Sequence, residues 1–211
     1  MFALSAEEWE IIRLSLKVAV WSVACSLPLA VMVAFLLARS SFPGKSLFDA
    51  VVHLPLVLPP VVVGYFLLLL LGRRGPLGAL LDEYFGIVVA FRWSGAAIAA
   101  GIMGFPLMVR AIRLSIEAID SGLEDAARTL GASRLKVFFS ITLPLALPGI
   151  FTGTLLSFAR SLGEFGATLM IAGNLPGRTQ TLSVAIYAAV QAGDDIHVEF
   201  TRLGSVRARF A

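Results

Sequence analysis

Charged and hydrogen-bonding side chains are scarce in this sequence, and two places group them in patterns that could do chemistry. The first is segment 121–144, a polar run that opens with acidic residues and lies between two strongly apolar stretches. The second is the group Arg160, Ser161 and Glu164, which directly follows an apolar stretch. The first pattern is typical of a docking surface, and the second is typical of a solute path or a structural ion pair.

Segment 121–144, which we call the docking loop, predicts two helices joined by a tight turn. Ser121 and Glu124 have the spacing of a capping box, so we expect Ser121 to cap a helix of about 9 residues. Gly131 ends this helix, because glycine adopts the left-handed conformation without steric cost, and Ser133 caps the second helix. The apolar stripe of the first helix consists of Leu123, Ala126, Ala127 and Leu130. Such a narrow stripe favours an interface over a buried core.

The group at 160–164 allows two interpretations. Arg160, next to a serine hydroxyl, could attract an oxyanion, because guanidinium and hydroxyl groups donate hydrogen bonds to such ions. Arg160 and Glu164 are also four residues apart, so on a helix they could pair with each other. The sequence leaves both interpretations open.

No other pattern in the sequence indicates catalysis, a metal site or a nucleotide site. Cys25 is the single cysteine, and the two histidines, His53 and His197, are far apart. The Gly-Lys-Ser string at 44–46 is similar to the end of a phosphate-binding loop, but Arg39 occupies the position of its first glycine. The basic residues flank apolar segments, unlike those of a nucleic-acid patch. We therefore expect no catalytic residue, no metal and no nucleic-acid partner.

Membrane spans are the elements that must position these residues. Of the 211 residues, 58% are hydrophobic and 15% are charged, and the mean hydropathy is +0.87. Four predicted spans cover residues 18–38, 54–71, 93–109 and 137–159. At about 1.5 Å per residue, the first of them matches a hydrocarbon core of about 30 Å. Prolines crowd the first half of the second, so we expect it to start irregularly or to be broken.

Several weaker signals complete the predicted topology. The sequence beyond Arg160 is apolar but interrupted, so part of it could return into the membrane. Gly149 and Gly153 favour close helix packing over a dimer contact. Basic residues are equally numerous on the two predicted sides, and their density in segment 110–136 favours a cytoplasmic docking loop. The predicted class is an all-α integral membrane protein.

The docking loop resembles the signature of the membrane permeases of ATP-binding-cassette importers. That signature is Glu-Ala-Ala, then glycine, then Ile-x-Leu-Pro, and it is matched here by Asp125, Ala126, Ala127, Gly131, Ile141, Leu143 and Pro144. Asp125 replaces the usual glutamate, and Glu124 directly before it keeps the negative charge. Further stretches that look like the molybdate importer permeases are 42–75, 105–120 and 158–177.

The resemblance implies a transmembrane domain over residues 1–193, with four to five transmembrane helices, that imports molybdate across the bacterial inner membrane. The partners it implies are a second copy of the chain, cytoplasmic ATPase subunits that bind ATP and Mg²⁺, an extracytoplasmic molybdate-binding protein and membrane lipid. This chain itself would hold no cofactor and would not be an enzyme. The implied ATPase-coupling residues are Leu123, Glu124, Asp125, Ala126, Ala127, Leu130, Gly131, Ile141, Leu143 and Pro144. The candidate residues of the oxyanion path are Ser157, Arg160, Ser161 and Glu164.

The end of the chain departs from the family. Residues 194–211 form a charged tail where the resemblance implies a final span, so we expect a truncated or frame-shifted terminus. Two alternatives to molybdate import stay open. A sulfate or tungstate permease would have the same architecture, because specificity is expected to lie mostly in the binding protein. A membrane structural or assembly subunit would have no polar cavity at Arg160 and Ser161.

Overall fold

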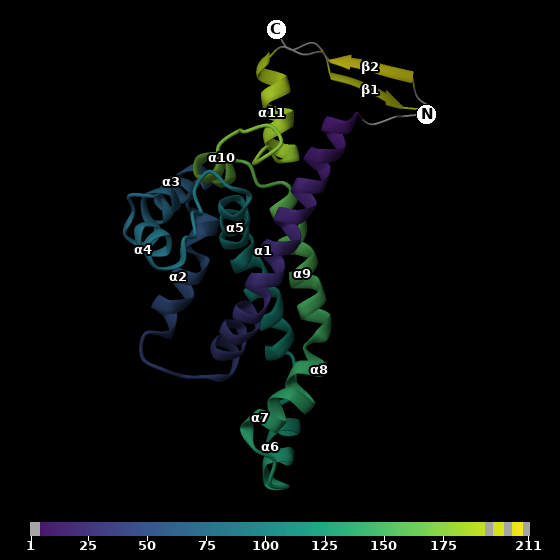
Figure 1. The fold of residues 1–211 in the computed structure, drawn as a ribbon. Coiled ribbons are helices and arrows are strands. Elements are labelled where there is room, and N and C mark those ends of the chain that lie inside the picture. Colours follow the sequence, from purple (N-terminus) through teal and green to yellow (C-terminus); the bar gives the residue numbers. More distant parts are fainter. Residues whose placement is uncertain (1–4, 193–195, 201–203, 209–211) are drawn as a thin grey trace.

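The computed structural model describes residues 5–192, 196–200 and 204–208, and most of them are helical (Figure 1). The helical bundle confirms the all-α class. An antiparallel hairpin of β1 (Ile196–Phe200) and β2 (Gly204–Ala208) follows it, and the sequence did not predict this hairpin. The predicted tail, 194–211, lies partly outside the described residues, so the division into domain and tail stays a prediction.

The first predicted span is part of a longer helix, α1 (Ala6–Arg39). A capping box begins it: the hydroxyl of Ser5 accepts the N–H of Glu8 at 3.2 Å, and the carboxylate of Glu8 accepts the N–H of Ser5 at 2.6 Å. Pro28 lies inside the helix without ending it. This helix and α5 (Trp93–Glu117), which contains the third predicted span, are each long and apolar enough to cross a membrane.

The other two predicted spans are bent helix pairs. Helices α2 (Lys45–Val57) and α3 (Pro60–Leu71) meet at 111°, as expected for a segment crowded with prolines. The fourth predicted span is interrupted. Its elements are α7 (Arg134–Val137), the π-helical turn η1 (Phe138–Thr142), α8 (Leu143–Leu145) and α9 (Leu147–Leu162). It bends by 65°, because Pro144 and Pro148 cannot donate helical hydrogen bonds.

Helix α5 lies at the centre of the bundle and contacts α1, α9 and α10 (Gly166–Ala172). Small residues let the helices approach closely: Gly101 lies against Ser22 of α1, and Gly149 and Gly153 lie against Ser115 and Met108 of α5. Both glycines of α9 therefore serve packing within the chain, as predicted.

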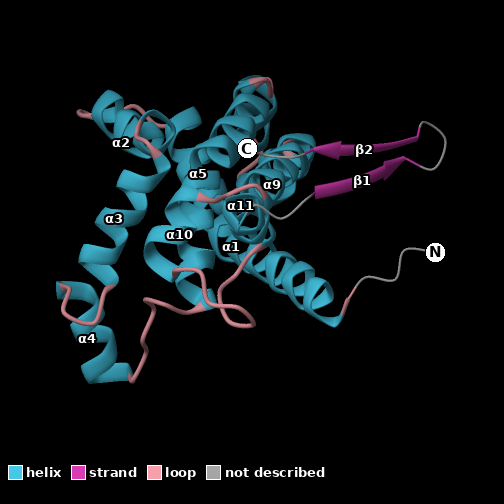
Figure 2. Cartoon of the chain, turned by 90° about the horizontal axis from the view of Figure 1, so that it is seen from above, coloured by secondary structure: helices cyan, strands magenta, loops and turns pink. Residues whose placement is uncertain are grey.

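The remaining helices lie at the ends and one side of the bundle. Helix α4 (Pro76–Phe85) occupies the predicted polar connection between α3 and α5. Figure 2 shows α3 and α4 on one side, with α10 between α3 and the centre. Helix α11 (Leu182–Ala192) lies at the end where α1 begins, whereas α6 (Ser121–Thr129) and α7 lie at the opposite end (Figure 1).

Candidate functional site

The first helix of the docking loop, α6, has the predicted length but a different N-terminal cap. Asp120 is the cap residue, and its carboxylate accepts the N–H of Gly122 at 2.8 Å. The predicted capping box of Ser121 and Glu124 is therefore wrong. Its spacing was correct, but tertiary partners hold the side chain of Glu124, so it does not fold back to the helix start.

The turn between α6 and α7 forms as predicted. Gly131 has φ of 84°, in the left-handed region where a side chain would be strained. The N–H of Ala132 donates to the carbonyl of Ala127 at 3.0 Å, which satisfies one of the last carbonyls of the helix. The hydroxyl of Ser133 then accepts the N–H of Lys136 at 3.3 Å and caps α7. Short-range hydrogen bonds thus define both ends of the turn.

Glu124 is the buried centre of the docking loop, with a relative exposure of 3%. Its carboxylate accepts hydrogen bonds from Nε of Arg39 at 3.1 Å, from the hydroxyl of Thr142 at 2.9 Å and from Nη2 of Arg128 at 3.4 Å. Arg39 also donates to the carbonyl of Ile119 at 3.0 Å. The carboxylate therefore ties α6 to the last residue of α1 and to the end of η1.

The sequence did not single out Arg39 or Thr142 as partners of the docking loop. The available signal was general: a buried carboxylate needs a cation and hydrogen-bond donors. Nothing in local spacing selects an arginine 85 residues earlier in the chain. Asp125, at the family's usual glutamate position, is 68% exposed and pairs with Arg128 at 2.8 Å. The neighbouring Glu124 is the buried acid.

The apolar stripe of α6 faces away from the bundle. Leu130 is 88% exposed, Leu123 and Ala126 are exposed, and Ala127 is half-buried. No element within the described ranges buries the stripe, and an uncovered apolar face of this kind is typical of a contact surface. The signature residues of the second half lie apart from it, in η1 and α8, where they are half-buried or exposed: Ile141, Leu143 and Pro144.

The charged group at 160–164 lies at the elbow between α9 and α10. Nη1 of Arg160 is 2.6 Å from Oε2 of Glu164, so the predicted ion pair is present. The carboxylate of Glu164 is fully buried, and its other oxygen accepts the N–H of Ala167 at 2.9 Å. The side chain of Arg160 remains 30% exposed. The pair therefore holds the elbow together and leaves part of the arginine side chain accessible.

The two serines of the predicted oxyanion path face neighbouring helices. The hydroxyl of Ser161 lies 3.0 Å from that of Ser22 on α1 and donates to the carbonyl of Ala100 on α5 at 3.4 Å. Ser157 is fully buried against Gly104 of α5. The structure therefore brings Ser161 and Ser157 into the junction of α1, α5 and α9. Arg160 lies in the last turn of α9, where it pairs with Glu164.

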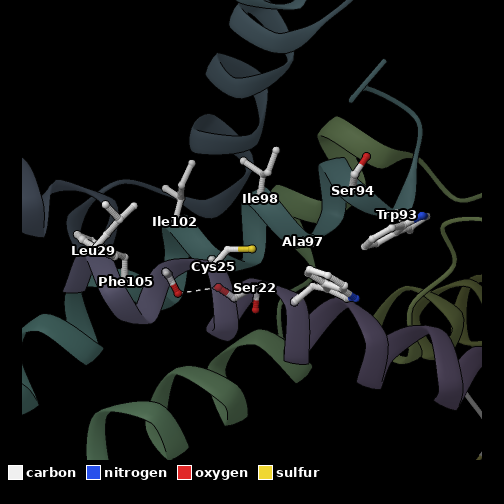
Figure 3. A pocket seen from close by; sticks show the side chains of 12 residues that line it. Ser22, Cys25, Leu29, Trp93, Ser94, Ala97, Ile98, Ile102 and Phe105 are labelled. Atoms are coloured by element: carbon white, nitrogen blue, oxygen red, sulfur yellow. Dashed lines mark hydrogen bonds between the residues drawn. The ribbon is translucent and has the colours of Figure 1, made fainter. Parts of the chain in front are cut away.

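An apolar cleft of about 490 Å³ lies between α1 and α5 (Figure 3), and Ser22, the partner of Ser161, lines it. Trp93 lines one end, and Leu29 and Phe105 line the other (Figure 3). Trp21 also lines the cleft, and its ring centroid lies 6.3 Å from that of Trp93. These walls do not suit a tetrahedral oxyanion, which needs several hydrogen-bond donors. Among the described residues there is no group of three His, Cys, Asp or Glu side chains that could hold a metal ion.

Comparison with known proteins places the chain in a family. Residues 26–194 match the family described as binding-protein-dependent transport system inner membrane component. The chain is 59% identical over 188 residues to the molybdenum transport system permease protein ModB of Escherichia coli, over 89% of this chain and 82% of that protein. It is 40% identical over 180 residues to the sulfate transport system permease protein CysW of Synechococcus elongatus, over 85% of this chain and 63% of that one.

A solved structure shares the fold at low identity. It is a bacterial ABC transporter involved in the import of the acidic polysaccharide alginate, and it matches with a TM-score of 0.67 at 19% identity. The match covers 90% of this chain and 70% of the other. The family match over residues 26–194 shows that this chain belongs to the inner membrane components of binding-protein-dependent transport systems.

Proposed function

We propose that this chain is the permease subunit of an ATP-driven importer that carries molybdate across the bacterial inner membrane. The observation that carries this proposal is the docking loop, in which an anchored helix presents an uncovered apolar stripe. A helix held by the buried carboxylate of Glu124 can transmit force, and an exposed stripe of small and apolar residues fits a groove in a protein partner. The similarity to a molybdenum permease over most of both chains supports molybdate as the ion.

The proposed partner at the docking loop is a cytoplasmic ATPase subunit, which binds ATP and Mg²⁺. Two copies of the chain would pair, and an extracytoplasmic binding protein would deliver the ion. When the ATPase subunits close, α6 moves, and the bonds from Glu124 to Arg39 and Thr142 pass the movement to α1 and η1. The spans would then open the path alternately to each side of the membrane. Among the proposed coupling residues, Leu123, Ala126 and Leu130 form the contact face.

We place the oxyanion path at the elbow of α9 and α10. The partly exposed side chain of Arg160 carries a guanidinium group that suits a tetrahedral oxyanion, and Glu164 holds this group when no ion is present. Ser157 and Ser161 would reach an ion only after α9 separates from α5 and α1.

In uptake assays, Arg160→Gln should raise the molybdate concentration needed for half-maximal uptake more than Arg178→Gln does, since Arg178 is an exposed arginine outside the elbow. Equal effects of both changes would refute this placement.

The decisive experiment is ATP-dependent uptake into proteoliposomes that contain the chain, its ATPase and the binding protein. We expect molybdate uptake that stops when ATP is omitted. Sulfate is the second candidate, because the chain is 40% identical to a sulfate permease. Sulfate uptake that is faster than molybdate uptake would identify sulfate as the transported ion. If the complex assembles and hydrolyses ATP but neither ion enters, the chain has a structural role and the proposal fails.

A further inference from the structure

A groove of about 890 Å³ lies between the second half of α1 and the docking loop. Its apolar walls are formed by Leu27, Val31, Met32 and Phe35 of α1 and by Phe138 and Phe139 of η1. Arginines gather at its other end, where Arg39, Arg128 and Arg134 line it. The groove therefore changes from fully apolar to cationic along its length.

The length of the groove corresponds to one leaflet of a bilayer. From Leu27 to Arg39, α1 advances by about 18 Å, and half of a hydrocarbon core is about 15 Å. Arg39 is the last residue of α1, so the cationic end lies where the span leaves the hydrocarbon region. The apolar walls then lie at the depth of acyl chains, and the arginines lie at the depth of lipid head groups.

The cationic end carries an excess of positive charge. Three guanidinium groups line it, and Glu124 is its one acidic lining residue. Arg39 and Arg128 share the carboxylate of Glu124, and Arg128 also pairs with Asp125 outside the groove at 2.8 Å. Arg134 is exposed and forms no ion pair with the described residues, so it supplies the excess positive charge. Ser40 adds a hydroxyl beside Arg39. This end is therefore complementary to a phosphate that carries a net negative charge.

We propose that the groove binds an anionic phospholipid, with one acyl chain along α1 and η1 and the phosphate near Arg134 and Arg128. Basic pockets beside membrane helices recognise lipids with anionic head groups in this way. A zwitterionic lipid would fill the same walls, but the ammonium group of its head would face the arginines. The proposal does not depend on the ion that the chain transports.

The test is native mass spectrometry of the full chain released from nanodiscs with equal amounts of phosphatidylglycerol and phosphatidylethanolamine. We expect phosphatidylglycerol to be retained preferentially. Arg134→Gln should reduce its retention about fivefold, because one surface cation contributes about 1 kcal/mol to anionic-lipid binding. Lys136→Gln is the matched control, since Lys136 is a basic, exposed residue of the same helix that does not line the groove. Equal retention of both lipids, or equal losses in both variants, would overturn the proposal.

A second measurement does not depend on the arginine variants. A phosphatidylglycerol with a photoreactive acyl chain, diluted into phosphatidylcholine, should label Met32 and Phe35 more strongly than Phe151 and Leu155, which are exposed on α9. Equal labelling of the two helices would mean that the lipid only surrounds the protein, and cross-linking of the groove to a second copy of the chain would assign it to a dimer contact. Either result contradicts the proposal.

Discussion

At the scale of single residues, one buried carboxylate, that of Glu124, holds the docking loop in place. Glu124 is removed from water and bonded to Arg39, Thr142 and Arg128, so each partner compensates part of its desolvation. Asp125 carries the same charge but faces water and pairs only with Arg128. Glu124 and Asp125 carry the same charge, but Glu124 therefore contributes more to the stability of the docking loop.

Glu124→Ala should destabilise the chain far more than Asp125→Ala. The first change leaves the guanidinium of Arg39 without its buried partner, and such a loss costs about 3–5 kcal/mol. The second removes an exposed pair worth about 0–1 kcal/mol. The free energy of unfolding in mixed micelles measures both, and limited proteolysis within 121–132 reports release of the loop. Similar losses in the two variants would show that the buried network does not hold α6.

At the scale of elements, close approaches and tight turns decide how force reaches the bundle. The turn at Gly131 sets the angle between α6 and α7, and the contact between α5 and α9 sets how the spans move together. Both depend on glycine, but for different reasons. Gly131 supplies a left-handed backbone, whereas Gly149 supplies space between helices.

Gly131→Val should abolish uptake, while Gly131→Asn should retain most of it. A β-branched side chain is strained at φ of 84°, so valine would change the turn and displace α6. Asparagine tolerates the left-handed region, so the turn is kept. ATP-dependent uptake in proteoliposomes, at matched amounts of folded protein, compares the variants. Unchanged uptake with valine would contradict the coupling role of the docking loop.

Gly149→Ala should weaken the packing of α9 on α5. The added methyl would lie 2.9 Å from the carbonyl oxygen of Ala111 and would overlap the side chain of Ser115, so the helices would have to separate. Overpacking of this kind costs about 1–3 kcal/mol. Gly163→Ala is the control, because its added methyl would meet neighbours only at 3.8 Å and beyond. The free energy of unfolding of both variants tests this, and equal values would contradict the close contact.

At the scale of the whole molecule, the docking loop and the turn at Gly177 lie at opposite ends of the bundle, about a membrane thickness apart. The ring centroid of Trp93, at the start of α5, lies 6.3 Å from that of Trp21 in α1. Ile116, near the end of α5, shares a core cluster with Leu37, near the end of α1. Helices α1 and α5 therefore run in the same direction. Both helices end beside the docking loop. The turn at Gly177 lies near Glu10, at the opposite end of α1.

Cysteine labelling should place these two ends on opposite sides of the membrane. Glu10 and Arg39 are about 44 Å apart along α1, more than a hydrocarbon core of about 30 Å. In a Cys25→Ala background, an impermeant maleimide should label Leu130→Cys only in inverted vesicles and Arg178→Cys only from the outside, since both positions are exposed. Labelling of both positions from one side would refute the proposed topology.

Local signals in the sequence determined the class, the helices and the turn of the docking loop. Hydropathy indicated the spans because backbone groups in lipid must bond within their own helix. Gly131 and Ser133 acted as predicted, since their effects depend only on neighbouring residues. An irregular start or a break in the second span was also predicted from its prolines, and the structure places a break before Pro60, because proline restricts the residue before it.

Only the tertiary structure decided which side chains meet. The partners of Glu124 lie 85 residues before it and 18 residues after it, so spacing along α6 led to a capping box that Asp120 replaces. The burial of Ser157 against Gly104 likewise depends on how α9 meets α5. Contacts between distant segments depend on helix crossing and close packing, which local periodicity does not specify.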